Sequence, residues 1–404
     1  MRRNWILFLC LFCILCGSLF AAAGDEHAFE LKWQAEGFHE QQGVDLERTE
    51  SFAVEPDFGD REVLRGQLSV GPSGNKEQVG FAWDISENKL YVDLNRDGDL
   101  TNDPNGVIGV KDASDRRNHN YYFETFPLSI STKEGVHRYQ ISVLGQNYPW
   151  HQMVTFTVRS GYSGAVELYG QMWGFEIGDR FKTQVGVGDT LSVRPKEQVK
   201  EGALKNHISS LPAPKSLFMD GHCYDLAFEF RKSDNDSLTL WCTLTEKDAP
   251  LAKLRIEGEG ISQLVFGDGS RLNSEHGMLM GPSDVLILPR LSESEMTVPV
   301  GNFWCRSLSL KGNEDRSVTP QGIDGIGVSV VAETDNVLKA GAPLNHQVKI
   351  QRSGKVLKFD YELVGIGGEK YDMRQISGYD NNNKPSVAIY KVGMQLAAGE
   401  FEYG

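Results

Sequence analysis

The chain has 404 residues, of which 40 % are hydrophobic, and its formal net charge is -14 at pH 7. A chain of this length forms two or three domains of ordinary size, and its apolar content is ample for packed cores. The excess of acid disfavours nucleic acids and anionic membranes as partners, because both carry negative charge. It is compatible with an exported protein and with divalent cations.

The N-terminus has the pattern of a secretory signal. Two arginines precede an apolar run over residues 5–20, and Ala21–Ala23 follow it as a small-residue cleavage site. We expect cleavage after Ala23 to remove residues 1–23 and release a periplasmic or extracellular protein. Loss of the two arginines would lower the net charge from -14 to -16. No later stretch is apolar enough to cross a bilayer, so we expect no transmembrane segment in the mature chain.

Short runs that alternate apolar and polar residues recur along the chain. A period of two places one face of a strand on a core and the other in water. Gly accounts for 43 of 404 residues, above its usual share of about 7 %, as a chain with many turns requires. We therefore predict an all-β, mainly antiparallel protein with two or three sandwich-like domains. Clear strand candidates are Arg65–Val70, Lys89–Asp93, His137–Val143, Met153–Val158, Tyr224–Phe230 and Ser237–Leu244.

Composition shifts suggest where the domains meet. Residues 195–210 are the best helical candidate, and the prolines that follow this charged run make it a good linker. We predict an N-terminal β domain over residues 24–210, a middle β domain over residues 211–316 and an immunoglobulin-like sandwich over residues 317–404. The strand candidates of this last domain are Gly327–Val331, His346–Ile350, Val356–Leu363, Ser386–Tyr390 and Gly399–Tyr403. We expect Gly399–Tyr403 to close an edge or to pair with the first of them.

The most informative segment follows the strand candidate Lys89–Asp93. It spaces oxygen-bearing side chains at alternate positions and has a glycine at its sixth place, which allows the sharp turn of a calcium loop. Asp99 offers its carbonyl from place seven, and Thr101 at place nine reaches an ion through water. We predict a Ca²⁺ site whose ligands are Asp93, Asn95, Asp97, Asp99, Thr101 and Asp103.

The segment resembles the calcium loops of the EF-hand and dockerin families over about a dozen residues. It departs from them at place twelve, where Pro104 replaces the bidentate acid, so we expect Asp103 or a more distant acid such as Asp112 to complete the site. The alternating residues before the loop and the proline after it predict a strand–loop site rather than a helix–loop–helix. The alternative is a hairpin turn at Asp97–Gly98 with solvated acids around it.

Three cysteines follow the signal segment: Cys223, Cys242 and Cys305. In an oxidising compartment a Cys223–Cys242 disulfide would join the two arms of a predicted hairpin. The alternative is three buried thiols that act as small apolar side chains.

No metalloprotease, nucleotide-binding or nucleophile-elbow motif is present in the sequence. We interpret Ser163 as a turn serine and assign structural roles to His222 and Cys223, because neighbours on a strand point to opposite faces. His119 lies among Arg116, Arg117 and Asn120 and is the other histidine of interest. Aromatic residues that would stack on sugars, or else fill cores, are Trp150 beside His151, Tyr169 with Trp173, and Trp304.

These patterns favour a secreted, calcium-stabilised, non-catalytic binding or structural protein of the cell envelope. Its partner would be a carbohydrate or a protein and not a nucleic acid. No catalytic residue is predicted. The alternative is an extracellular hydrolase of polysaccharides or peptides whose catalytic carboxylates have no recognisable spacing.

Overall fold

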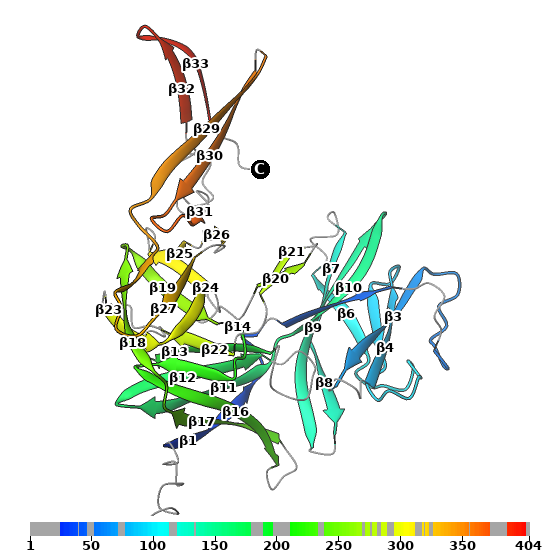
Figure 1. Cartoon of the computed structure of the whole chain (residues 1–404). Helices are drawn as coiled ribbons and strands as arrows, with labels where there is room; N and C mark the ends of the chain where they lie inside the picture. Colours follow the sequence, from blue (N-terminus) through cyan, green and yellow to red (C-terminus); the bar gives the residue numbers. More distant parts are fainter. Residues whose placement is uncertain are drawn as a thin grey trace, which may run out of the picture. The chain divides into compact units, whose positions relative to one another are not determined.

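The computed structural model describes residues 25–38, 40–46, 52–71, 77–112, 119–132, 135–178, 189–196, 211–232, 238–268, 271–274, 277–280, 284–288, 295–311, 317–318, 320–322, 326–354, 356–371 and 386–400. The elements in these ranges are all β-strands (Figure 1). Most pairs are antiparallel, whereas β15–β22 and β18–β28 are parallel. The predicted all-β, mainly antiparallel class is confirmed. The predicted signal over residues 1–23 lies outside the described ranges.

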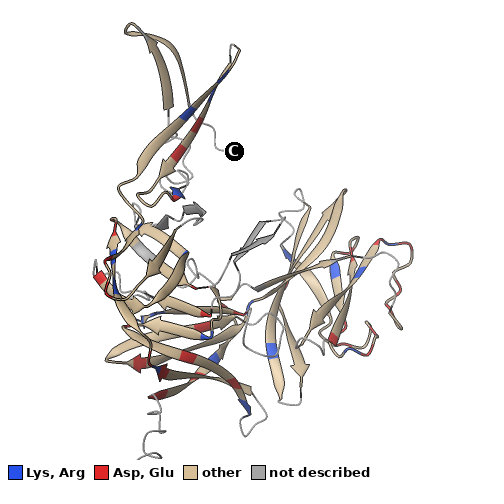
Figure 2. Cartoon of the chain, viewed as in Figure 1, with Lys and Arg blue, Asp and Glu red and all other residues tan. Residues whose placement is uncertain are grey.

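The chain divides into two compact units. The N-terminal unit comprises residues 27–213 and 227–244, and the C-terminal unit comprises residues 214–226 and 245–404 with Asp25 and Glu26. The division into three domains, with boundaries at residues 210 and 316, stays a prediction. Figure 2 shows acidic and basic residues interspersed over the strands and loops of both units, so the negative charge is not gathered on one element.

The first sheet of the N-terminal unit has nine strands, blue to cyan in Figure 1. Its order is β2-β10-β9-β7-β6-β5-β4-β3, and β8 also pairs with β9. The strands are β2 (Glu40–Asp45), β3 (Val63–Val70), β4 (Glu77–Asp84), β5 (Lys89–Val92), β6 (Val107–Asp112), β7 (Asn120–Phe123), β8 (Phe126–Ser131), β9 (Val136–Tyr148) and β10 (His151–Val158).

This sheet curls around its own core, because apolar residues at alternate positions of nearly every strand belong to one buried cluster. Phe81 and Phe156 meet edge to face with ring centroids 5.0 Å apart. Trp83 is fully buried and packs against Gly145, where an added Cβ would lie 2.8 Å from the indole ring. Only glycine fits at that position.

The second sheet of the unit has the order β14-β13-β12-β11-β1-β17-β16. It consists of β1 (Glu26–Gln34), β11 (Gly161–Leu168), β12 (Gln171–Gly178), β13 (Thr190–Pro195), β14 (Leu211–Pro212) and most of β16 (His222–Lys232) and β17 (Leu238–Lys247). The Trp33 indole N–H donates to the Arg138 carbonyl of the first sheet at 3.0 Å. The predicted helix over residues 195–210 falls almost wholly outside the described ranges, and Pro195 itself ends β13.

The C-terminal unit contains a sandwich. Six strands are linked through β15, β22, β19 and β24, and three further strands form the sheet β23-β18-β28. Side chains from both sheets, including Leu254, Phe266 and Leu308, share one hydrophobic cluster. The strands are β15 (Ser216–Met219), β22 (Val285–Leu288), β19 (Ile261–Gly267), β24 (Gly301–Lys311), β25 (Ser317–Val318), β27 (Gly327–Val330), β23 (Glu295–Pro299), β18 (Leu251–Glu257) and β28 (Asn336–Lys339).

Hairpins complete the C-terminal unit. Two are two-stranded: β20 (Arg271–Ser274) with β21 (Gly277–Met280), and β32 (Ser386–Lys391) with β33 (Met394–Glu400). A third hairpin, β29 (Asn345–Ser353) with β30 (Val356–Val364), belongs to a four-stranded sheet that also contains β31 (Lys370–Tyr371) and β26 (Pro320–Gly322). The last described strand pairs with its neighbour β32, whereas β27 pairs with β24. Gly399 and Glu400, the described residues of the expected final strand, therefore pair with β32 and not with Gly327–Val331, because a tight turn at Val392–Gly393 favours the local partner. Residues 401–403 of that expected strand lie outside the described ranges.

Candidate functional site

The predicted calcium loop begins where β5 ends. The main-chain N–H of Asp93 donates to the Gly80 carbonyl at 2.9 Å, which extends the pairing of β5 with β4 by one residue. The Asp93 side chain is only 4 % exposed. Arg96 and Gly98 have φ angles of 65° and 83°, which fold the chain back on itself. The sheet thus fixes the first predicted ligand, and two left-handed residues bend the loop around it.

Carboxylate and amide oxygens inside the loop accept its main-chain N–H groups. Asp93 accepts from Asp97 at 3.2 Å and from Gly98 at 3.0 Å. Asn95 Oδ1 accepts from the Asp97 N–H at 2.9 Å, and Asp97 Oδ1 accepts from the Asp99 N–H at 2.9 Å. Asp99 Oδ1 accepts both the N–H and the hydroxyl of Thr101. Both Asp93 oxygens and Asp97 Oδ1 accept one of these bonds each, which leaves each a second acceptor direction for a cation, whereas Asp99 Oδ1 already accepts two.

The far side of the loop is fastened to a small apolar cluster. Val54 donates its N–H to the Gly98 carbonyl at 3.3 Å and accepts the Leu100 N–H at 3.0 Å. Leu100 is buried with Phe58 and other apolar residues of this cluster. Movement of the loop would therefore break a β-bridge and expose Leu100, which couples the loop to the stability of the sheet.

The acids of the loop influence one another. Asp103 accepts the Leu94 N–H at 2.9 Å. Partial burial, together with the charges of Asp93 and Asp97, raises the pKa of the Asp103 carboxyl. Hydrogen bonds from Asn102 and the Asp99 N–H lower the pKa of Asp97, which lies exposed at the rim. A divalent cation would offset the repulsion that Asp103 feels, because opposite charge favours the ionised form.

The six predicted ligands lie on one short loop, but acids alone do not make the site. Within the described ranges, no three His, Cys, Asp or Glu side chains are arranged to hold a metal ion. A calcium site here would also need the amide of Asn95, the hydroxyl of Thr101 and the main-chain carbonyl of Asp99, which are oxygen ligands of the kind calcium takes. The Asp112 side chain lies outside the described residues.

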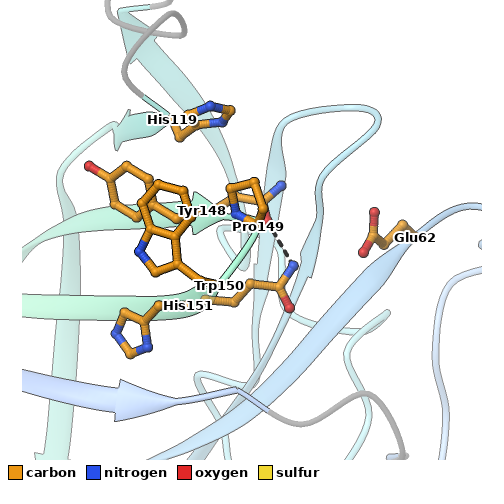
Figure 3. A pocket seen from close by; sticks show the side chains of 8 residues that line it. Glu62, His119, Tyr148, Pro149, Trp150 and His151 are labelled. Carbon is orange, nitrogen blue, oxygen red and sulfur yellow. Dashed lines mark hydrogen bonds between the residues drawn. The ribbon is translucent and has the colours of Figure 1, made fainter.

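A second feature of the N-terminal unit is a pocket of about 470 Å³ beside the β9–β10 turn (Figure 3). Pro149 and Trp150 form the two-residue loop between the paired residues Tyr148 and His151. The Trp150 side chain is 80 % exposed, and its ring stacks on that of Tyr148 with centroids 5.4 Å apart and an angle of 17°. The lining residues are Glu62, His119, Asn147, Tyr148, Pro149, Trp150, His151 and Gln152.

The sequence singled out Trp150 beside His151, and His119 separately, and the structure places all three around one pocket. Sequence reasoning missed Glu62, which comes from just before β3. It also missed Asn147 and Gln152, which are cross-strand partners and whose amide side chains bond at 2.7 Å. The available signal was the polar, aromatic character of the segment Asn147–Gln152, which ends one strand and starts the next.

The other aromatic candidates lie apart from this pocket. Trp173 is buried in the second sheet at 3 % exposure, as the core alternative predicted, whereas Tyr169 at the β11–β12 turn is 56 % exposed. In the C-terminal unit, Trp304 on β24 is 38 % exposed.

The candidate nucleophiles have ordinary structural surroundings. Ser163 is not a turn serine but lies inside β11, opposite Lys32 on one side and Glu176 on the other. The strand begins at Gly161, where an added Cβ would lie 2.6 Å from the Phe38 ring. His222 Nδ1 lies 2.7 Å from a carboxylate oxygen of Glu246.

The three cysteines are free and buried, so the predicted Cys223–Cys242 disulfide is not formed. Cys223 instead packs into the same hydrophobic cluster as Cys305. Burial raises the pKa of the Cys242 and Cys305 thiols to about 12. These thiols pack as small apolar side chains.

Comparison of the chain with protein-family models, curated protein sequences and solved structures finds no significant match. Among the residues that the structure describes, no helix is long and apolar enough to span a bilayer.

Proposed function

We propose that this is an exported, calcium-stabilised, non-catalytic binding or structural protein of the cell envelope. The observation that carries the proposal is the loop from Asp93 to Asp103. It follows the strand β5, bends at Gly98 in the left-handed conformation, and carries oxygen-bearing side chains at alternate positions. Its resemblance to EF-hand and dockerin loops favours Ca²⁺ over other cations, since calcium takes several oxygens in flexible geometry.

Calcium would act here through stability. The loop is bonded to Val54 and its Leu100 is buried in the apolar cluster beneath, so an ion that holds the loop closed also holds the edge of the sheet. An ion that binds only the folded state stabilises it by mass action. The proposed role of calcium is therefore structural, and ligands would bind elsewhere on the unit.

The residues considered for catalysis are held in structural arrangements. Ser163 sits in mid-strand, His222 is paired with Glu246, and Cys223 is buried, with a pKa that this burial raises. None of these three arrangements provides an activated nucleophile, which needs a base within reach and an open approach for substrate.

One observation favours the alternative of a hydrolase. Glu62 lines the same pocket as His119 and His151, so a carboxyl group and imidazole rings, the side chains that most often act as general acids and bases, face one cavity. Incubation with polysaccharide and peptide substrates separates the two functions. The proposal predicts no turnover by the wild type, whereas turnover that Glu62→Gln abolishes would establish the hydrolase.

Export is a separate part of the proposal and rests on the N-terminal sequence. Intact mass measurement of protein recovered from the periplasm or medium should show an N-terminus near Gly24. A membrane-free mature protein that retains Met1 would exclude cleavage of the signal.

A further inference from the structure

We infer that the pocket beside the β9–β10 turn binds a neutral carbohydrate, with one pyranose ring lying on the exposed face of Trp150. The inference rests on the proposed binding function and gives that function a site and a ligand class. Pockets that hold small ligands commonly measure about 300 to 1,000 Å³, and this one, at about 470 Å³, falls within that range.

Ring contacts and hydrogen bonds hold the Trp150 platform in its position. Trp150 stacks on Tyr148. The Tyr148 ring also contacts the His119 ring, with ring centroids 5.7 Å apart. The Tyr148 hydroxyl bonds to Asn120 Oδ1 at 3.3 Å. The main-chain N–H of Asn147 donates to the His119 carbonyl at 3.0 Å, which ties the turn to the start of β7. A flat apolar ring held in place costs little conformational entropy when a ligand stacks on it.

Both hydrogen-bond donors and acceptors surround this platform. Asn147 and Gln152 present amides, which both donate and accept hydrogen bonds, and His119 and His151 present ring nitrogens. Figure 3 shows Glu62 at one side of the pocket and the two histidines on the other. A pyranose matches this pattern, because its C–H groups form an apolar face while its hydroxyls, each a donor and an acceptor, project from the edge.

Other ligands that stack on tryptophan fit less well. A nucleotide would bring phosphate to a pocket whose described lining residues include a carboxylate and neither Lys nor Arg, on a chain of net charge -14. A quaternary ammonium ion prefers several aromatic faces turned toward it, whereas here Tyr148 and Trp150 are stacked on each other at 17°.

Isothermal titration calorimetry on the mature chain in calcium tests the inference. The probes are linear β-1,4-linked hexasaccharides of glucose, N-acetylglucosamine, xylose and mannose, with AMP as a stacking ligand that carries phosphate. At least one hexasaccharide should bind, and AMP should not. Trp150→Ala should weaken binding by about tenfold or more, as loss of a central aromatic contact typically does. Trp150→Phe should retain part of the affinity.

The matched control is Tyr169→Ala, which removes an exposed aromatic ring from another turn of the same unit. It should bind like the wild type, and all variants should keep the wild-type melting temperature. Failure of every hexasaccharide to bind, or equal binding by Trp150→Ala, overturns the carbohydrate site and leaves the calcium-stabilised protein standing. Binding of AMP overturns the ligand class. Hydrolysis of a bound hexasaccharide would instead overturn the non-catalytic function while the sugar site stands.

Discussion

The carboxylate of Asp93 accepts a hydrogen bond of 3.0 Å from the main-chain N–H of Gly98. This bond closes the loop across its sharpest bend, where Gly98 has φ +83°. The end of a buried strand and the turn of the predicted calcium loop are thus joined directly. The conformation of Gly98 should therefore affect both the stability of the unit and its response to calcium.

Gly98→Ala should lower the free energy of unfolding by about 1 to 2 kcal/mol, because an L-residue is strained in the left-handed region. The added methyl would lie 3.7 Å from Ala53 Cβ, an ordinary contact, so backbone strain rather than crowding is the cause. Urea denaturation measures the change. Gly109→Ala, at an open position on β6, is the control and should stay within about 0.5 kcal/mol of the wild type. Equal effects of the two substitutions would show that the bend carries no special strain.

Asp103→Asn should separate charge repulsion from metal binding. The amide oxygen can still accept the Leu94 N–H, but the charge that Asp93 and Asp97 repel is gone. In chelator the variant should therefore melt at or above the wild-type temperature, and in calcium it should gain less. The raised pKa of Asp103 also means that calcium binding weakens as pH falls through it, since the proton and the ion compete. A full calcium gain in Asp103→Asn would exclude Asp103 as the replacement for the twelfth-place ligand.

His137 should make the N-terminal unit sensitive to acid. Its ring lies 1 % exposed with a centroid 4.7 Å from that of Phe230, and its two nitrogens have no hydrogen-bond partner among the described residues. Burial lowers the pKa of His137 from 6.5 to about 4. The unfolded chain therefore binds more protons between these values, and stability falls as pH drops from about 6.5 to 4.

His137 should make the wild type about 2 kcal/mol less stable at pH 5 than at pH 7, because its pKa is 6.5 in the unfolded chain and about 4 in the folded one. His137→Leu removes the titrating group and should reduce the pH dependence by that amount. Urea denaturation at the two pH values measures it. An unchanged difference between pH 5 and pH 7 in His137→Leu would mean that other groups cause the acid sensitivity.

The thiols should be unreactive until the chain unfolds. Cys223, Cys242 and Cys305 are free and buried, and burial raises their pKa values. Iodoacetamide at pH 8 should label none of them in the native protein and all three in denaturant, as read by peptide mass spectrometry. A Cys223–Cys242 linked peptide after non-reducing digestion would contradict the free thiols.

Local sequence patterns were enough to predict the strands. The period of two in Met153–Val158 appears as β10, and the alternation in Lys89–Asp93 appears as β5 with Asp93 at its end. Such patterns report which residues share a face, and they hold because each strand must bury one face. Local patterns were also enough to predict that the candidate ligands lie on one loop between Asp93 and Asp103.

Partners across the fold were not predictable in the same way. The cluster that holds Cys223 with Cys305 depends on packing between strands distant in sequence, so the hairpin argument for a disulfide failed. The segment Gly161–Gly164 is typical of a turn and so predicts a turn serine at Ser163, yet its glycines serve close packing within the sheet. Glu62 reaches the aromatic pocket only through the curl of the first sheet, which no local pattern encodes.

The melting temperature of the mature protein in calcium and in chelator tests the central claim most directly. A site with a dissociation constant of about 10⁻⁴ to 10⁻³ M, saturated at about 100 times that value, adds roughly 2.7 kcal/mol. For a domain of about 150 to 250 residues this raises the melting temperature by about 5 to 11 °C. Asp97→Ala should erase most of the gain, and Glu167→Ala, an exposed acid on β11, should retain it. The same melting temperature in saturating calcium and in chelator would contradict the account and leave the loop as an acidic turn.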